Sequence, residues 1–352
     1  MKRPTECLFA RQKRIAAYRL HERCKRAGLR QKKTESRYVR PGEIIKAPEA
    51  FNLTLGQGIQ VVKFLRAVSD RVLRQGKQVQ LDFRRTRMFY VPATILLFAE
   101  LDRVVSSATI HKPITLLQPT ERRPREVLKQ IGLFNLTQDR CDTVPERSDV
   151  VYWKATKGSL QSGDQFAMLE AVAETVNKQH KEQLQISGLW RGVSEAVANT
   201  VDHAYLRPRS DGFEGLPDTK WWMFTQLKDG HFTAAVCDLG CGYASTIDST
   251  LPEQFLTTIR ATLKGISRDS QAVQAAMEYG RSGTRESNRG KGSRDALSLL
   301  ENHGNGELVV LSGSGGMRYE YRNGGELSRA EIDLAIDIRG TIVWWKLPLN
   351  GE

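Results

Sequence analysis

Hydrophobic residues recur along this chain at two periods, one typical of helices and one of strands. Between Gly56 and Gly76 they return every three or four positions, with Ile59, Val62 and Leu65 among them, which predicts an amphipathic helix. Further helices and strands are expected nearby: Val79–Phe83 and Ile114–Leu117 as strands, Pro92–Val105 and Arg125–Leu133 as helices. Helix and strand therefore alternate over residues 46–145, which predicts a small α/β domain.

The second half of the chain predicts longer strands and a different architecture. The polar segment Asp139–Asp149, which contains Pro145, marks the expected boundary, so a second domain covers residues 146–352. Its expected strands are Val150–Lys154, 221–228, 231–238, 307–312, 317–322 and Thr341–Leu347, with helices at about 164–182, at 187–205, within 243–279 and from Ser293. Helices with a mostly antiparallel sheet predict an α+β sandwich.

Composition favours a cytoplasmic globular protein with no membrane segment. Of the 352 residues, 40% are hydrophobic and 26% are charged, as in ordinary soluble proteins. The longest apolar stretch, Val91–Ala99, is too short to cross a bilayer, and the first residues lack the apolar region of a secretory signal. Five scattered cysteines, an odd number, suggest free thiols in a reducing compartment.

Positive charge is concentrated in an N-terminal arm, residues 1–45. Its first 40 residues hold 14 Lys and Arg but 3 Asp and Glu, which accounts for +11 of the net charge of +13. A basic helix over Leu8–Lys25 would suit nucleic-acid binding through phosphate contacts, and a solvated arm is the alternative. Cys7, His21 and Cys24 lack a fourth ligand, so no zinc site is expected there.

Three polar segments of the second half carry the candidate chemistry, and the first is Glu195–Ala204. Glu195, Asn199 and His203 are spaced by four residues and are expected along one face of a helix. The amide oxygen of Asn199 suits Mg²⁺, which takes its other ligands from water and phosphates. Glu195 could deprotonate an attacking water or hydroxyl, whereas His203 is expected to be structural. An exposed polar stripe is the alternative interpretation of this helix.

The second segment follows the strand that ends at Asp238. An ionised carboxylate only accepts hydrogen bonds, so Asp238 suits the exocyclic amino group of adenine and disfavours guanine. Gly240 and Gly242 allow the backbone to turn tightly beside it. An ordinary strand-to-turn exit is the alternative for this five-residue pattern.

The third segment is a Gly-rich loop that leads into a helix expected from Ser293. Its glycines allow backbone N–H groups to converge on an anion, and the helix dipole would favour the same phosphates. The candidate phosphate-binding residues are Ser282, Gly283, Thr284, Arg289, Gly290, Lys291 and Gly292. A flexible surface loop is the alternative.

Taken in this order, the three segments resemble the boxes of the GHKL ATPase superfamily over about residues 150–349. Ser194–Asn199 with His203-Ala204-Tyr205 is similar to the N box of anti-sigma-factor serine kinases, and Asp238–Gly242 is similar to the G1 box. Gly290–Gly292 resembles the G2 box that follows an ATP lid. The resemblance implies a Bergerat α/β sandwich that binds ATP and Mg²⁺, with Asn199 as the magnesium ligand, Glu195 as the base and Thr341 helping to hold adenine.

The first domain resembles a STAS domain, the fold of anti-sigma-antagonist regulators. The resemblance rests on Gln80–Phe83, on Met88–Leu97 and on Glu126–Leu133 as the final helix. Pro92 stands where regulatory members carry a phosphorylatable Ser, so a phosphorylation switch is not expected here.

These features predict a regulatory protein that hydrolyses ATP with Mg²⁺ and couples closure of its lid to a rearrangement of domains or partners. Two alternatives stay open, a protein serine/threonine kinase of the anti-sigma type and a nucleic-acid-associated switch that acts through residues 1–40. The expected partners are ATP and a regulatory protein. A homodimer is a further option, and a sensor histidine kinase is disfavoured because no phosphoacceptor hairpin precedes the ATPase.

Overall fold

The computed structural model describes residues 42–53, 56–143, 150–158, 186–209, 211, 220–250, 253–262, 268–281, 292–322 and 327–349. Residues 1–41 of the basic arm, the expected helix at about 164–182 and the expected division between residues 145 and 146 lie outside the described residues. From Pro41 onward the chain forms one compact unit, distinct from the first 40 residues. The expected end of the arm at residue 45 is wrong, because strand β1 of the compact unit already begins at Glu43. Every described helix and strand belongs to that unit.

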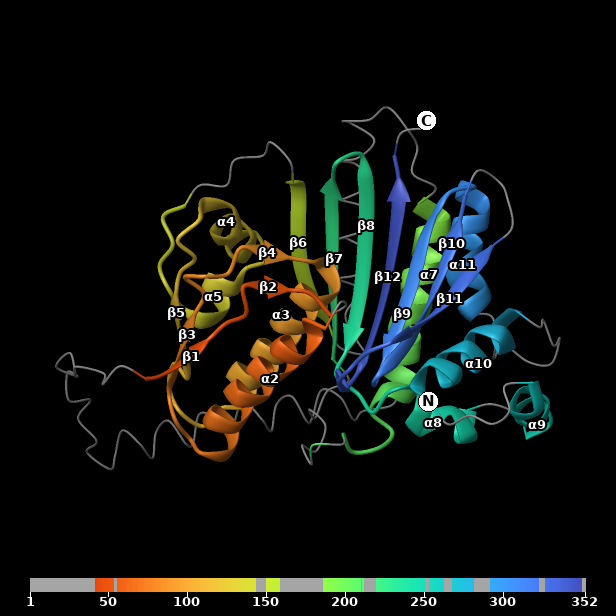
Figure 1. The fold of residues 1–352 in the computed structure, drawn as a ribbon, viewed down its shortest axis with the longest axis horizontal. Helices are drawn as coiled ribbons and strands as arrows, with labels where there is room; N and C mark the ends of the chain where they lie inside the picture. The colour runs from red at the N-terminus through yellow and green to blue at the C-terminus, as the bar shows by residue number, and fades with distance from the viewer. Residues whose placement is uncertain are drawn as a thin grey trace, which may run out of the picture. The chain divides into compact units, whose positions relative to one another are not determined.

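A three-stranded parallel sheet, in the order β1-β3-β5, organises the first part of the chain (Figure 1). Its strands are β1 (Glu43–Lys46), β3 (Val79–Asp82) and β5 (Ile114–Leu117), with a pair of two-residue strands, β2 (Ala50–Phe51) and β4 (Met88–Phe89), beside it. Its helices are α2 (Gly58–Ser69) with the π-helical turn η1 (Asp70–Arg74), α3 (Val91–Ser107), α4 (Arg122–Gln130) and α5 (Leu133–Thr137). The predicted α/β alternation is confirmed, and β1, β2 and β4 are additions. Strands β2 and β4 are too short to leave a period in the sequence, and β1 was missed because its residues are mostly exposed.

Helix α3 is buried on all sides, because it lies between two sheets. Every residue from Ala93 to Val104 is buried, including the charged Glu100, Asp102 and Arg103. On one side α3 packs against α2, and on the other it packs against strands β7, β8 and β12 of a larger sheet. The unbroken apolar run Ile95–Ala99 follows from this position, since a helix that is hydrophobic all round has no face left for water.

The larger sheet has seven strands in the order β11-β10-β9-β12-β8-β7-β6, and every neighbouring pair is antiparallel. Its strands are β6 (Val150–Gly158), β7 (Trp221–Lys228), β8 (His231–Asp238), β9 (Gly306–Ser312), β10 (Gly315–Tyr321), β11 (Ser328–Asp333) and β12 (Thr341–Pro348). The mixed α/β class expected from the sequence is confirmed. Strand β11 was not expected, because five of its six residues are exposed and it carries no apolar alternation.

The central strands of this sheet are covered on both faces. Along β7, Trp221 and Met223 belong to one hydrophobic cluster while Trp222 and Phe224 belong to another, as the alternation of side chains in a strand requires. The second cluster is continuous with the core of the first part of the chain: the rings of Phe98 and Phe224 lie 5.9 Å apart. The indole N–H of Trp222 also donates to Asp102 at 3.1 Å.

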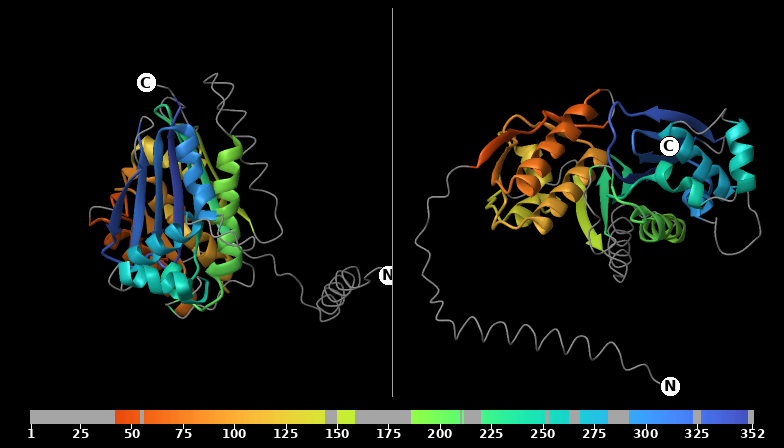
Figure 2. Two further views of the ribbon diagram at one scale, coloured as in Figure 1. Left: turned by 90° about the vertical axis from the view of Figure 1, so that its right-hand side faces the viewer. Right: turned by 90° about the horizontal axis from the view of Figure 1, so that it is seen from below.

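Helices of the second half cover the opposite face of the sheet (Figure 2). They are α7 (Ile186–Asn199), α10 (Asp269–Arg281) and α11 (Gly292–His303), with α8 (Tyr243–Thr250) packed against α10 and α9 (Glu253–Thr262) beside it. Trp345 of β12 is fully buried under α11 and donates its indole N–H to the carbonyl of Ala296 at 3.0 Å. The described residues thus form helix, sheet and helix layers with a core on each face of the sheet.

The continuous core predicts that Phe98→Ala, a change in the first part of the chain, destabilises the large sheet. Loss of a buried ring costs about 3 kcal/mol or more of unfolding free energy. All six tryptophans lie between residues 153 and 345, so urea unfolding followed by tryptophan fluorescence reports on the sheet. The midpoint should fall for Phe98→Ala and stay unchanged for Ile44→Ala, an exposed position. An unchanged midpoint for Phe98→Ala would mean that the two parts unfold independently.

Candidate functional site

Asp238 ends strand β8 and is 6% exposed, between Trp221 of β7 and Thr341 of β12 in the sheet register. Its carboxylate accepts the backbone N–H of Gly240 at 2.9 Å. Polar groups of Thr341 and Thr200 also favour the ionised carboxylate, while the Thr200 hydroxyl itself donates to the carbonyl of Ala196 at 3.0 Å. Burial raises the pKa of Asp238 to about 6, although the Gly240 N–H and these polar groups oppose the shift.

Two glycines hold the backbone close around this carboxylate. A Cβ at Gly240 would collide with the carbonyl oxygen of Ala204, so only glycine allows the two loops to touch. Gly340 has a φ of 146°, and a Cβ there would collide with the carbonyl oxygen of Asp238. Gly242, the other predicted glycine, has a φ of 76°, and its Cβ would meet the hydroxyl of Ser312 at 2.9 Å. The predicted glycines are therefore required by the backbone itself.

Helix α7 brings the first predicted segment to the same place. Glu195 and Asn199 lie on its last turns, both half-buried, and Asn199 is its final residue. The π-helical turn η2 (Thr200–Ala204) follows and departs from the even spacing expected through His203. This turn begins with Thr200, which acts on the ionisation of Asp238, and ends with Ala204, whose carbonyl accepts the N–H of Cys241 at 2.8 Å. Asn199 directly precedes Thr200, so the end of α7 lies beside the segment that carries Asp238.

Tyr243 lies where it is affected electrostatically by both acidic residues of the site, Asp238 and Glu195. It is the first residue of α8, and its backbone N–H donates to the hydroxyl of Ser312 at 2.9 Å. Burial raises the pKa of its phenol, and the negative charges of Asp238 and Glu195 raise it further. Both carboxylates therefore act electrostatically on a single phenol, which gathers the first two predicted segments into one region.

Sequence reasoning missed three members of this cluster. Thr200 directly follows Asn199 but carries no motif of its own, and Tyr243 follows the Gly240–Gly242 turn without any pattern that marks it as functional. Ser312 lies within 3.2 Å of the Thr341 hydroxyl, and the sequence predicted it only as the last residue of a strand, which is β9. That Ser312 belongs to the site is evident only from the sheet register, in which Ser312 of β9 pairs with Thr341 of β12.

The predicted lid ends at a helix that the structure does describe. Gly292 is the first residue of α11, one position before the expected start, while the other candidates fall outside the described residues: Ser282, Gly283, Thr284, Arg289, Gly290 and Lys291. At its other end α11 carries His303, whose imidazole Nε2 lies 2.7 Å from the Pro348 carbonyl. Pro348 pairs with the residue that begins β8, so α11 directs its N-terminus toward the sheet edge that holds Asp238. That direction suits phosphate binding.

A buried ion-pair network lies beside the site. Arg209, which follows η2, contacts Glu100 of α3 at 2.7 Å and Asp211 at 2.8 Å. Arg339, which precedes Gly340, contacts Asp211 at 2.9 Å. Burial alone would raise the pKa of Glu100, but the charges of Arg209 and Arg103 outweigh it and hold the pKa below its usual value. The network therefore ties α3 to both loops that surround Asp238.

Metal-binding potential rests on a single carboxamide. Within the described ranges, no group of three or more His, Cys, Asp or Glu side chains gathers as a metal cage would. A Mg²⁺ ion that takes most of its ligands from phosphate oxygens and water needs no such cage, and Asn199 offers the one hard oxygen required. In the same part of the chain, no helix has the length and apolar character to cross a membrane.

Comparison with known proteins does not identify a family for this chain. No protein-family model matches the chain, and a search of curated proteins found no match. The candidate function therefore rests on the geometry of the Asp238 cluster.

For ATP, the ligand expected from the sequence, the raised pKa of Asp238 predicts an affinity that depends on pH. Only the ionised carboxylate is purely an acceptor, so affinity should rise as pH increases through about 6 and approach a plateau near pH 7. Asp238→Asn should remove this component, while the ionisation of ATP itself contributes equally to both proteins. Calorimetric titration from pH 5 to 7.5 measures the difference. Parallel profiles for the two proteins would show that Asp238 does not titrate in the binding step.

For the protein without nucleotide, the raised pKa of Asp238 has the opposite consequence: folding stability should decrease as pH rises. Between its unfolded value of 3.8 and its folded value of about 6, the native carboxyl binds a proton more tightly than the unfolded one. Its contribution to stability is therefore largest below pH 4 and declines as pH rises to 6. Thermal melts of the wild type and Asp238→Asn across this range should diverge with increasing pH, with the wild type losing relative stability.

Proposed function

We propose that this protein is a cytoplasmic ATP-binding regulator of the GHKL superfamily, in which a STAS-like part precedes the nucleotide-binding part. The observation that carries the proposal is Asp238, a buried carboxylate at the end of a central strand, whose ionisation is favoured by Thr341 and by Thr200, the residue after Asn199. A buried acceptor of this kind suits the exocyclic amino group of adenine. The order of the three polar segments along the chain supports the same proposal.

In this proposal each segment has one task. Asp238 accepts a hydrogen bond from adenine, and Thr341 and Thr200 hold the carboxylate in position. Asn199 is the protein ligand of Mg²⁺, which when bound neutralises charge on the phosphate oxygens. Glu195, one helical turn before Asn199, accepts a proton from the attacking water. The Ser282–Gly292 segment closes over the phosphates at the N-terminus of α11.

The ion-pair network supports coupling between ATP and the first part of the chain. Arg209 and Arg339 flank the two loops that contact Asp238, and both reach acidic partners within a buried cluster that includes Glu100 of α3. A change in either loop on nucleotide binding would therefore shift charges against α3. Buried ion pairs are sensitive to such shifts. When the two charges separate, each stays buried without the attraction that offset the cost of removing it from water.

Transfer to water and transfer to a protein hydroxyl require the same residues. A serine/threonine kinase would also use Glu195 as base and Asn199 as metal ligand. Incubation with γ-labelled ATP separates the two: free phosphate indicates hydrolysis, and label on the chain or on an added partner protein indicates kinase activity. Hydrolysis is the expected outcome for the purified protein.

Glu195→Gln should keep ATP affinity within about threefold and reduce phosphate release by at least about 100-fold, since it removes the base and leaves the nucleotide contacts. Asn199→Ala should weaken binding of Mg–ATP itself. Glu301→Gln, an exposed carboxylate on α11, is the matched control and should change neither quantity. Unaltered phosphate release by Glu195→Gln, together with unaltered affinity in Asn199→Ala, would refute the assignment.

The coupling is tested by amide hydrogen exchange along α3. Saturating Mg–ATP should change protection of residues 91–107 in the wild type, through the contacts of Arg209 and Arg339. Glu100→Gln should abolish that change while ATP still binds, because the neutral amide cannot pair with Arg209. Protection that does not respond to ATP in the wild type would contradict coupling through this network.

A further inference from the structure

Two loops at the carboxyl edge of the parallel sheet carry an unusual density of arginine. The loop after β3 contains Arg84, Arg85 and Arg87, and the residues that begin α4 after β5 include Arg122, Arg123 and Arg125. Neither stretch contains a lysine. All are exposed except Arg125, which is half-buried. This concentration belongs to the folded body and is independent of the basic arm.

The two loops meet in space, so their charges act together. The N–H and the hydroxyl of Thr120 donate to the carbonyl of Arg84 at 3.3 and 2.8 Å. Arg87 forms an ion pair with Glu121 at 3.3 Å. The carbonyl of Arg140 accepts the Gln118 side chain at 2.7 Å, which brings a seventh arginine to the group. These seven arginines are called the arginine edge: Arg84, Arg85, Arg87, Arg122, Arg123, Arg125 and Arg140.

Carboxylates neutralise only part of this edge. Asp82 holds Arg84 with two hydrogen bonds of 2.9 and 2.8 Å, and Arg84 in turn lowers the pKa of Asp82. Glu126 pairs with Arg122 at 2.9 Å. Arg125 instead donates to two backbone carbonyls, and among the described residues Arg85 and Arg140 have no carboxylate partner. Positive charge therefore remains at the surface.

The first turn of α4 lacks the negative charges that usually stabilise the N-terminus of a helix. It contains no acidic residue, and the N-cap Glu121 makes no capping hydrogen bond with its side chain. Arginines stand there instead, where the positive end of the helix dipole disfavours them. Unfavourable placement of charge at a helix end is expected where those side chains serve a function. A bound anion would relieve it.

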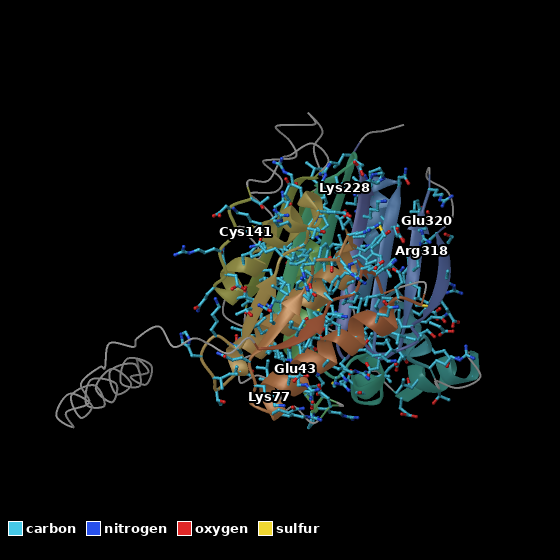
Figure 3. The ribbon with its side chains drawn as sticks, turned by 60° about the vertical axis from the view of Figure 1, so that its left-hand side comes forward. Glu43, Lys77, Cys141, Lys228, Arg318 and Glu320 are labelled. Atoms are coloured by element: carbon cyan, nitrogen blue, oxygen red, sulfur yellow. The ribbon has the colours of Figure 1, made fainter. Side chains whose placement is uncertain are left out.

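Hollows with basic walls lie on either side of α4. One, of about 450 Å³, is lined by Arg122, Arg125 and Arg140 together with Gln118, Asp142 and Thr143. The other, of about 700 Å³, runs from Arg87 and Arg123 to Tyr90, and on the large sheet to Trp344, Lys346 and Lys228, which is labelled in Figure 3. The Tyr90 side chain is exposed, at 47%. The larger hollow also contains Glu126, Asp229 and Glu307, so its basic side chains lie toward Arg87 and Arg123 at one end and Lys228 and Lys346 at the other. Basic side chains beside an exposed aromatic ring suit single-stranded nucleic acids, whose bases stack while their phosphates pair.

We propose that the arginine edge binds the phosphate backbone of a single-stranded nucleic acid and that Tyr90 stacks on one of its bases. Arginine supplies planar, bidentate contacts to phosphate, which lysine does not. An anionic membrane attracts lysine and arginine alike, so the exclusive use of arginine in these loops favours nucleic acid. The edge adds a binding surface of its own to any contribution from the basic arm.

Fluorescence anisotropy of a labelled 20-nucleotide oligouridine with the full chain tests the proposal. The edge variant Arg85→Ala/Arg123→Ala/Arg140→Ala should bind at least about tenfold more weakly at 100 mM salt. Its plot of log affinity against log salt should be less steep by about 2, because three phosphate contacts are lost. The control variant Arg318→Ala/Arg322→Ala/Arg329→Ala removes the same charge from β10, from the residue that follows β10 and from β11, and should bind as the wild type. Figure 3 shows Arg318 far from Cys141, the neighbour of Arg140.

Tyr90→Ala separates stacking from charge. It should weaken oligouridine binding by about 5- to 100-fold and leave binding of heparin, a polyanion without bases, unchanged. Thermal melts establish that each variant is folded. Equal losses in the edge and control variants would overturn the proposal, since binding would then depend on net charge alone. Binding of phosphatidylserine vesicles that falls in the edge variant, with oligouridine binding unaffected, would also overturn it and identify a membrane surface.

Discussion

The burial of one carboxylate, that of Asp238, is the constraint on which the candidate site depends. A charge withdrawn from water at the end of a central strand is costly, and the surroundings offset that cost only in part, as its raised pKa shows. The polar groups that favour its ionised form come from three separate segments, represented by Thr200, Gly240 and Thr341. Their convergence fixes the positions of α7, of the Gly-rich turn and of β12.

That constraint also explains the connection to the first part of the chain. The loops that present Thr200 and Thr341 continue directly into Arg209 and Arg339, whose buried charges require acidic partners. One of those partners, Glu100, belongs to α3, a helix enclosed between the two sheets. The site and the α/β part therefore share both a hydrophobic core and a charged network, which gives the proposed regulation a physical route.

Much of this arrangement follows from the sequence, because long strands and helices leave clear periods. The bounds of β7 and β8 and the glycines beside Asp238 were predicted from pattern alone. The π-helical turn after Asn199 was not, since nothing local distinguishes it from a continuing α-helix. Ser312 and Tyr243 join the site only through pairing and packing between distant segments, and the arginine edge forms because two loops about 35 residues apart meet at one end of a parallel sheet.

The central claim is that Asp238 recognises the amino group of adenine from a buried position. Calorimetric titration of the full chain with ATP, with GTP and with purine riboside triphosphate, which lacks that amino group, tests it most directly. An unpaired buried carboxylate is costly, so the account predicts that both analogues bind at least about 100-fold more weakly than ATP. Equal affinity for all three nucleotides would contradict it.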